Sequence, residues 1–374
     1  MEPDERYMQS ALDLARRGLG KTSPNPMVGA VLVKDGEIVG KGFHEKAGAP
    51  HAEINAISDA GDKARGSALY VNLEPCSHHG RTPPCTDAII SSGIGKVVVA
   101  MTDPNPLVSG EGIRKLRAAG IEVITGVLEK DASRLNEAFI KYITTKTPFL
   151  ILKSAMTLDG KIATKSGRSR WISGERSRNF VHKLRSISDG IIVGIDTVIH
   201  DDPMLNVRLD GQHNNPIRII VDSRGRMPLE SRIARSAGEI KTILATTELA
   251  GRTKLAALES EGVEIAMLPA KQGHVDLHAL MLLLGNKEIS TLLAEGGGTL
   301  NYSFLSENLI DKIYFFVAPK LIGGKEAQTP VEGDGVMEID EAWIVEDMEI
   351  EMFDNDLLIT GYPVRGERNV YRDS

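Results

Sequence analysis

His51, Cys76 and Cys85 are the residues of this chain whose types and spacing point most directly to chemistry. One imidazole and two thiolates form the three-ligand shell of a catalytic zinc, and they leave the fourth position open for water. The chain has two cysteines, and both belong to this set. Glu53, two residues after the histidine, stands where zinc deaminases place a general acid/base that is not a metal ligand. The pattern therefore predicts the hydrolytic deamination of an amino-bearing nitrogen heterocycle.

Two other interpretations of these three residues are a structural zinc site and plain buried side chains. A structural zinc needs a fourth protein ligand, which His78 or His79 could supply. The gap of eight residues between the cysteines is also longer than the Cys-x-x-Cys of cytidine deaminases. We favour the catalytic site because a glutamate follows the histidine at the spacing that the reaction needs.

A glycine-rich turn in the second half of the chain is a candidate phosphate site. Glu295-Gly296-Gly297-Gly298 follows the apolar run 291–294 and opens a helix. Glycines let the backbone approach a ligand closely, and a helix start offers N–H groups to an anion. Ser223 and Arg224 follow another apolar run and could bind a further phosphate. A tight strand-to-helix turn explains the glycines equally well, and Trp171 is either a core aromatic or the wall of a planar-ligand pocket.

The elements that must position the first set alternate between strands and helices, which predicts an α/β layer with helices on the faces of a sheet. His51 and Cys85 fall at two helix N-termini, where the helix dipole stabilises thiolates. Residues 34–37 form a hairpin turn. The predicted helices are 7–19, 51–60, 86–92, 111–119 and 129–145, and the predicted strands are 28–33, 38–43, 68–73, 96–101 and 121–125.

A chain of 374 residues is too long for one typical core, so we expect two domains. Pro148 interrupts the helical pattern, and the expected domains are therefore 1–146 and 147–374. The second half also alternates, with Ser173 as the expected N-cap of its first helix. Its predicted strands are 149–155, 190–194, 217–221, 240–246, 263–268 and 291–294, and its predicted helices are 175–185 and 277–284.

The bulk composition is that of an ordinary globular protein. The formal net charge of −7 gives no electrostatic reason to expect a nucleic acid or an anionic membrane as partner. No long uncharged apolar run could span a bilayer. The chain opens with acidic residues rather than with the basic and apolar regions of a signal peptide. Because metal-binding thiols must stay reduced, we expect a cytoplasmic protein.

Nearly the whole chain resembles the bifunctional riboflavin biosynthesis proteins, in which a diaminohydroxyphosphoribosylaminopyrimidine deaminase is fused to a 5-amino-6-(5-phosphoribosylamino)uracil reductase. The long cysteine gap, with Gly80-Arg81-Thr82-Pro83-Pro84 inside it, resembles the variant of the deaminase motif found in this family. The other motifs that carry the resemblance are Asn25 to Gly29, Gly48 to Glu53, Glu74-Pro75-Cys76, Asp103 to Pro106, Ser154 to Lys161, Asp201-Asp202-Pro203, Asp222-Ser223-Arg224 and Glu295 to Gly298.

The resemblance implies a cytidine-deaminase-like α/β/α layer domain followed by a dihydrofolate-reductase-like α/β domain. It implies zinc in the first domain and NADPH in the second, with small phosphorylated pyrimidines as substrates and association into homo-oligomers. The first reaction would deaminate 2,5-diamino-6-(5-phosphoribosylamino)pyrimidin-4(3H)-one. The second would reduce the ribosyl side chain of 5-amino-6-(5-phosphoribosylamino)uracil to ribityl.

The resemblance also assigns residues to these ligands. Glu53 would be the catalytic residue of the deaminase, and Lys153 would lie near the ribose that is reduced. NADPH would face Ala155, Trp171, Thr197, Asp201, Ser223, Gly297, Gly298, Thr299, Leu300, Asn301, Tyr302 and Ser303. The substrates would face Asn25, His44, Arg81 and Thr82 in the first half, and Ser169, Arg185, Leu205, Arg208 and Glu295 in the second.

Two rival functions make different demands on the sequence. A nucleic-acid base deaminase with an appended binding domain would need a basic groove and aromatic stacking positions. The acidic balance and the aromatic content of 5% argue against it. A non-catalytic, zinc-stabilised binding protein would need the fourth ligand from His78 or His79.

Overall fold

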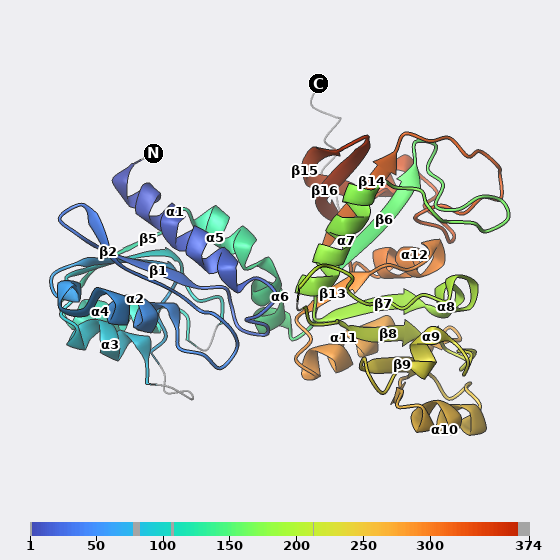
Figure 1. Ribbon diagram of the computed structural model, residues 1–374, viewed down its shortest axis with the longest axis horizontal. Coiled ribbons are helices and arrows are strands. Elements are labelled where there is room, and N and C mark those ends of the chain that lie inside the picture. The colour runs from blue at the N-terminus through green and yellow to red at the C-terminus, as the bar shows by residue number, and fades with distance from the viewer. Residues whose placement is uncertain (1, 78–82, 106–107, 212, 366–374) are drawn as a thin grey trace. The chain divides into compact units, whose positions relative to one another are not determined.

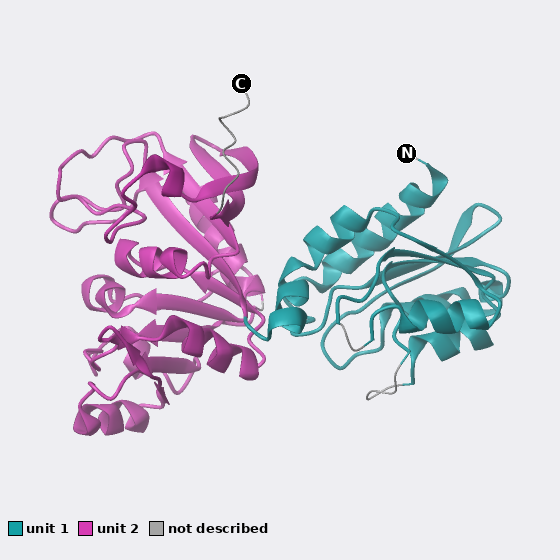
Figure 2. Ribbon diagram, turned by 180° about the vertical axis from the view of Figure 1, so that it is seen from behind, with its two compact units in different colours: residues 1–147 teal, residues 148–374 magenta. Residues whose placement is uncertain are grey.

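The computed structural model of the chain describes residues 2–77, 83–105, 108–211 and 213–365. The chain divides into two compact units, Met1–Thr147 and Pro148–Ser374 (Figure 2). The boundary lies one residue beyond the expected one. Within the described ranges, no helix has both the length and the apolar character needed to cross a membrane.

The first unit is built on a five-stranded sheet in the order β2-β1-β3-β4-β5 (Figure 1). β1 pairs antiparallel with β2 and β3, whereas β3, β4 and β5 run parallel. Its elements are α1 Pro3–Ala15, β1 Gly29–Lys34, β2 Glu37–Phe43, α2 Ala52–Ala60, β3 Ala68–Leu73, α3 Cys85–Ser91, β4 Lys96–Met101, α4 Glu111–Ala118, β5 Glu122–Thr125, α5 Glu129–Leu135 and α6 Glu137–Thr145.

Helices cover both faces of this sheet, because its central strands are apolar on both sides. Val97 and Val99 of β4 pack with α2, α3 and α4, whereas Val98 and Ala100 pack with α1 and α5. Successive side chains of a strand point to opposite faces, so one apolar run supplies two cores. The predicted α/β/α layering of the first half is therefore confirmed.

The turn between β1 and β2 lies where the hairpin turn over residues 34–37 was expected. The turn at Asp35-Gly36 has positive φ at both residues, 50° and 81°, as a tight two-residue hairpin turn requires.

The single helix expected over 129–145 is wrong, because the chain leaves helical geometry at Asn136. The Asn136 side-chain amide accepts from the Met27 N–H at 2.8 Å and donates to the Met27 carbonyl at 3.0 Å. A tertiary contact thus divides the helix into α5 and α6.

The second unit is built on a nine-stranded sheet in the order β10-β9-β8-β7-β13-β6-β14-β16-β15. The strands from β10 to β14 in this order run parallel, and β16 and β15 continue the sheet antiparallel. Its elements are β6 Phe149–Thr157, α7 Glu175–Ile187, β7 Gly190–Gly194, α8 Ile195–Asp201, β8 Ile217–Val221, α9 Arg232–Arg235, β9 Thr242–Thr246, α10 Arg252–Ser260, β10 Glu264–Met267, β11 Ala270–Lys271, β12 His274–Val275, α11 Leu277–Asn286, β13 Thr291–Ala294, α12 Gly298–Ser306, β14 Lys312–Ala318, β15 Ile344–Phe353 and β16 Asp356–Val364.

The two faces of this sheet carry different cores. Leu150 and Leu152 of β6 pack with α11 and α12 on one face. Helix α7 lies against the other face (Figure 1), where Ala155 of the same strand packs with Phe180 and Val181. Because side chains alternate along a strand, Lys153 also points to the α7 face. Lys153 and Ala155 therefore share the face of the sheet that carries α7.

Ser173 is not the N-cap of α7, contrary to the sequence prediction. Gly174 occupies the N-cap, and its N–H donates to Asp356 Oδ2 at 2.7 Å. The Ser177 hydroxyl donates to the same oxygen at 2.6 Å. A carboxylate 182 residues away in the chain thus satisfies the helix start, which local sequence preference cannot reveal.

Candidate active sites of the two units

His51, Cys76 and Cys85 come together in the first unit with ligand atoms that all lie within 4.8 Å of one another. His51 Nδ1 is 3.2 Å from Cys85 Sγ and 3.6 Å from Cys76 Sγ. A tetrahedral zinc with ordinary bond lengths would separate its nitrogen and sulfur ligands by about 3.5 Å. The donor set and its spacing therefore fit zinc.

The fold brings these three residues from two helix starts and one strand end. His51 is the N-cap of α2, and Cys85 is the first residue of α3. A Cβ atom at Gly42 of β2 would lie 2.2 Å from the Ala52 carbonyl, so glycine is what lets α2 approach the sheet this closely. The Cys85 backbone N–H donates to Cys76 Sγ at 3.3 Å, which joins the strand end to α3.

A buried carboxylate orders the loop beside Cys76. Glu74, 5% exposed, accepts from the backbone N–H groups of Asp103 at 3.0 Å, Gly110 at 2.9 Å and Ile113 at 3.1 Å. Three N–H donors satisfy a charge that would otherwise be costly to bury. Glu74 therefore fixes the chain two residues before the cysteine.

Of the two thiols, Cys76 loses its proton more readily than Cys85. The hydrogen bond from the Cys85 thiol lowers the pKa of Cys76, and the same interaction raises the pKa of Cys85. A thiolate is the form that binds a metal. The cluster thus presents one ready anionic ligand, and the second proton leaves when a metal binds.

Glu53 lies beside the cluster and is 3% exposed. Burial raises the pKa of Glu53 above its ordinary value, and the Cys85 side chain hydrogen-bonds to it. A carboxyl group whose pKa is shifted towards neutrality is suited to accept and return a proton at working pH. Glu53 is therefore positioned for acid/base chemistry next to the metal ligands.

The residues expected to hold the substrate of the first unit are only partly near one another. His44 is buried, and its ring lies 5.7 Å from the His51 ring in an edge-to-face arrangement. Burial lowers the pKa of His44, so its ring is neutral near pH 7. Asn25 is exposed. Arg81 and Thr82, like His78 and His79, lie outside the described residues.

A pocket of about 330 Å³ opens in the second unit at the carboxyl ends of the parallel strands. Lys153, Ser154 and Ala155 of β6 line it, and so does Glu295, which follows β13. Ligands of open α/β sheets bind at this edge. Six basic and two acidic side chains line the pocket, in a chain whose net charge is −7. The pocket therefore favours an anionic ligand.

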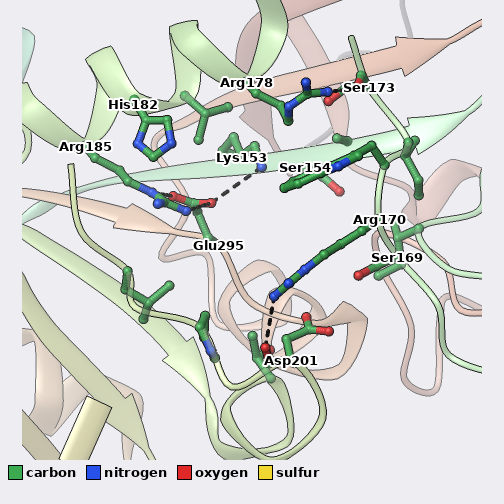
Figure 3. Close-up of a pocket in the computed structure, with 18 of the residues that line it drawn as sticks. Lys153, Ser154, Ser169, Arg170, Ser173, Arg178, His182, Arg185, Asp201 and Glu295 are labelled. Atoms are coloured by element: carbon green, nitrogen blue, oxygen red, sulfur yellow. Dashed lines mark hydrogen bonds and ion pairs between the residues drawn. The ribbon is translucent and has the colours of Figure 1, made fainter. Parts of the chain in front are cut away.

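Arg185, Glu295 and Lys153 form a buried charged group at one end of this pocket (Figure 3). Arg185 grips Glu295 in a bidentate pair, Nε to Oε1 at 2.6 Å and Nη2 to Oε2 at 2.9 Å. Lys153 Nζ lies 3.5 Å from Glu295 Oε2. Ala294 pairs with Leu152 in the sheet, and this register places Glu295 beside Lys153.

This charged group makes the stability of the second unit pH-dependent. Burial alone would raise the pKa of Glu295, but the charges of Arg185 and Lys153 hold it at about 2, below its ordinary 4.5. Because the folded pKa is the lower one, the stabilisation is complete above pH 4.5 and is lost as the pH falls towards 2. We expect a loss of about 3 kcal/mol over that window. Urea unfolding at several pH values, compared with the double variant Arg185→Met/Glu295→Met, measures it. The same pH slope in both proteins would contradict the prediction.

The pocket gathers ten of the residues assigned to the second unit and leaves others outside its lining. Three of these side chains donate to residues 330–335 instead: Thr299 to Glu332 Oε2, Asn301 to the Pro330 carbonyl and Tyr302 to the Gly335 carbonyl. The Ser223 hydroxyl accepts from the Val275 N–H at 3.0 Å. The lining includes Lys153, Ala155, Ser169, Trp171, Arg185, Thr197, Asp201, Leu205, Arg208 and Glu295, but, among the described residues, neither Ser223 nor any residue from Gly297 to Ser303. A cofactor role for the residues outside the lining stays a prediction.

Several basic residues that sequence reasoning did not single out also line the pocket. Arg178 and His182 lie on α7 with Arg185, and Arg170 precedes Trp171. Spacings of four and three residues place the first three on one helix face, a signal that the predicted helix already contained. Burial, followed by the charges of Arg185 and Arg208, lowers the pKa of His182 to about 4, so its ring is neutral. Arg208 Nη2 lies 3.3 Å from His182 Nε2.

Comparison with known proteins assigns the two units. Residues 1–101 match the cytidine and deoxycytidylate deaminase zinc-binding region, and residues 148–359 match the RibD C-terminal domain. The riboflavin biosynthesis protein RibD of Actinobacillus pleuropneumoniae is 45% identical over 356 residues, which are 95% of this chain and 94% of that protein.

Solved structures agree with this assignment over the full length. Acinetobacter baumannii RibD has a TM-score of 0.86 at 40% identity, covering 97% of this chain and 99% of that one. A Thermotoga maritima protein described as a diaminohydroxyphosphoribosylaminopyrimidine deaminase/5-amino-6-(5-phosphoribosylamino)uracil reductase has a TM-score of 0.84 at 39% identity, with the same coverage. The expected fold classes of both units are thereby confirmed. The chain belongs to the RibD family of riboflavin biosynthesis proteins, bifunctional enzymes that join a zinc-binding deaminase domain to a reductase domain.

Proposed function

We propose that the chain catalyses two successive steps of riboflavin biosynthesis, one in each unit. The first is the deamination of 2,5-diamino-6-(5-phosphoribosylamino)pyrimidin-4(3H)-one. The second is the NADPH-dependent reduction of the resulting 5-amino-6-(5-phosphoribosylamino)uracil. The observation that carries the proposal is the pairing, in one chain, of a three-ligand metal cluster beside buried Glu53 with a basic pocket around Lys153. The Thermotoga maritima relative, named for both activities, supports the same assignment.

In the first unit, His51, Cys76 and Cys85 would hold zinc. Zinc, when bound, supplies the Lewis acidity that makes a water nucleophile available near neutral pH. Glu53 takes a proton from the attacking water and passes it to the pyrimidine ring nitrogen and then to the leaving amine. Water adds to the amino-bearing carbon, and ammonia leaves. Because Glu53 is 3% exposed, its carboxyl group has little contact with bulk water.

In the second unit, the pocket residues orient the sugar and its phosphate. NADPH, when bound, supplies the hydride that is added to C1 of the ribosyl group. A proton must reach the ring oxygen of the ribose as the ring opens to the ribityl chain. The Lys153 ammonium is a hydrogen-bond donor on the pocket wall, and in this proposal it donates the proton to the ring oxygen. Glu295 fixes Lys153 from one side.

The phosphate of the substrate would bind to the arginines of the same pocket. Arg208 is exposed to the pocket, and the described residues offer its guanidinium no carboxylate partner. Arg185 donates three of its five N–H groups, two to the Glu295 carboxylate and one to the Asn206 carbonyl. Two donors remain for a ligand. Guanidinium groups match phosphate oxygens in a bidentate geometry, which supports this role.

Incubation of the purified protein with the diaminopyrimidine phosphate, with and without NADPH, tests the proposal. We expect ammonia release in both cases and NADPH oxidation only after deamination. Ammonia release with no NADPH oxidation would overturn the second activity. Neither signal would overturn the whole proposal.

Removal of the metal should separate the two activities. A chelator is expected to abolish ammonia release, because the nucleophile is then no longer generated. NADPH oxidation with added 5-amino-6-(5-phosphoribosylamino)uracil should persist, since the second unit uses no metal in the proposed reaction. Zinc addition should restore ammonia release, measured with a coupled assay. Loss of both activities on chelation would contradict the separation.

Location and assembly complete the proposal. Two thiols that must stay reduced to bind metal suit a reducing cytoplasm.

Association into homo-oligomers is supported by the edge strand β15, where Met348, Ile350 and Met352 are 55–60% exposed. Exposed apolar patches of this kind favour self-association. Light scattering of the purified protein measures the oligomeric state.

A further inference from the structure

One wall of the reductase pocket is held by two cationic side chains. The wall consists of Trp171, Ile172 and Ser173. Lys320 Nζ donates to the Trp171 carbonyl at 2.7 Å and to the Ile172 carbonyl at 2.6 Å. Arg178 Nη1 donates to the Ser173 carbonyl at 2.7 Å. Three consecutive carbonyl groups of the wall thus accept charge-assisted hydrogen bonds, which are stronger than neutral ones.

Arg178 also contacts the indole ring of the same wall. Its guanidinium carbon lies 4.6 Å from the centroid of the Trp171 ring, within the range of a cation–π interaction. The indole remains 60% exposed and lines the pocket. The Arg170 guanidinium carbon also lies 6.0 Å from the same centroid, so guanidinium groups cover part of the ring and its exposed remainder is available to a planar ligand. Figure 3 shows Arg178 reaching towards Ser173 at the edge of the pocket.

The backbone that carries Lys320 is itself fixed to the sheet. Lys320 follows β14, and its carbonyl accepts from the Leu158 N–H at 2.9 Å. The Asp159 carboxylate accepts from the N–H groups of Ile322 at 3.1 Å and Gly323 at 2.6 Å. Residues 320–323 are thereby joined to the turn that follows β6. The backbone that carries the Lys320 side chain is thus fixed by hydrogen bonds to residues 158 and 159.

We propose that Lys320 and Arg178 are positioning residues that hold the Trp171 wall in place, so that the indole packs against a planar ring of NADPH. This inference rests on the proposed NADPH-dependent reduction. Neither residue needs to touch the reacting atoms. Their effect is to order the wall before the cofactor arrives, so that binding does not have to supply that ordering. Loss of either cation should weaken NADPH binding more than it slows the chemical step.

The chain offers a direct probe of this wall, because its two tryptophans are Trp171 and Trp343. In a Trp343→Phe background, all tryptophan fluorescence comes from Trp171. Lys320→Met and Arg178→Met remove the two cations, and Lys320→Arg keeps the charge. Lys325→Met is the matched control, since Lys325 is an exposed lysine of the same segment that makes no side-chain hydrogen bond or ion pair with the described residues.

Two readouts follow the wall without and with the cofactor. Acrylamide quenching of Trp171 in the free protein should increase in Lys320→Met and Arg178→Met, because the wall is no longer held. The Kd for NADPH, measured by energy transfer from Trp171, should rise on the order of tenfold. The KM for NADPH should rise in parallel, while kcat changes little. Lys320→Arg should restore part of the affinity, and Lys325→Met should behave like the parent.

The outcomes separate this inference from the function on which it rests. Increased quenching with unchanged NADPH affinity would overturn the positioning role, and so would unchanged quenching in both Met variants. A parent protein that does not bind NADPH would overturn the proposed cofactor, and the inference with it. Ammonia release, measured in parallel, confirms that each variant retains a folded first unit, and urea unfolding reports on the second.

Discussion

Replacing Glu53 with glutamine is expected to reduce ammonia release on the order of 10²–10⁴-fold while zinc stays bound. Glutamine has nearly the same shape but cannot exchange the proton that the reaction moves twice. The metal ligands His51, Cys76 and Cys85 are unchanged, and removal of a buried acidic group should not destabilise the unit. Ammonia release and zinc content of the purified variant measure both halves of the expectation.

The matched control is Glu45→Gln, which removes an exposed carboxylate close in sequence to the cluster. We expect this variant to keep full ammonia release. NADPH oxidation with the deaminated substrate should be unaffected in both variants. Retained zinc together with unchanged ammonia release in Glu53→Gln would show that the metal is structural.

Lys153→Met is expected to reduce NADPH oxidation on the order of 10²–10³-fold, because the donor beside the ribose is lost. Ammonia release should not change. The second unit should stay folded, since Arg185 still neutralises Glu295 through its bidentate pair. Single-turnover oxidation of NADPH with 5-amino-6-(5-phosphoribosylamino)uracil separates slower chemistry from weaker binding.

Lys183→Met serves as control for this prediction, because Lys183 is exposed on α7, two residues before Arg185. It should retain full reductase activity. An equal loss in both lysine variants would point to a general charge effect on the anionic ligands. An unchanged rate in Lys153→Met would remove Lys153 from the mechanism.

Sequence reasoning was strongest where local pattern and local structure coincide. The strands of the first unit and the helix starts at His51 and Cys85 follow from apolar periodicity and from Pro84. It failed where a distant residue intervenes. Asn136 breaks a helix to bind Met27, and Asp356 moves the start of α7 to Gly174. Neither partner is visible in the local sequence, because propensity describes only near neighbours.

The last three strands of the second unit, β14, β15 and β16, were not predicted. β15 is exposed along most of its length, so it lacks the apolar signature of a strand. β14 pairs parallel with β6, and β16 pairs antiparallel with β14, so both strands extend the sheet beyond β6. β14 does carry the aromatic and β-branched composition of a strand, so this strand was open to prediction from the sequence.

By itself, the sequence determined the metal chemistry of this protein, because two cysteines, one histidine and one glutamate at fixed spacing leave few other uses. It also indicated the two-unit α/β organisation, because apolar periodicity is a local property and because the length of the chain exceeds what one core can hold. Only the tertiary structure decided how the reductase pocket is built. Glu295 meets Arg185 and Lys153 across 110 and 142 residues of chain, and Lys320 reaches Trp171 across 149. Such contacts are set by strand register and by burial, which arise only when the sheet assembles.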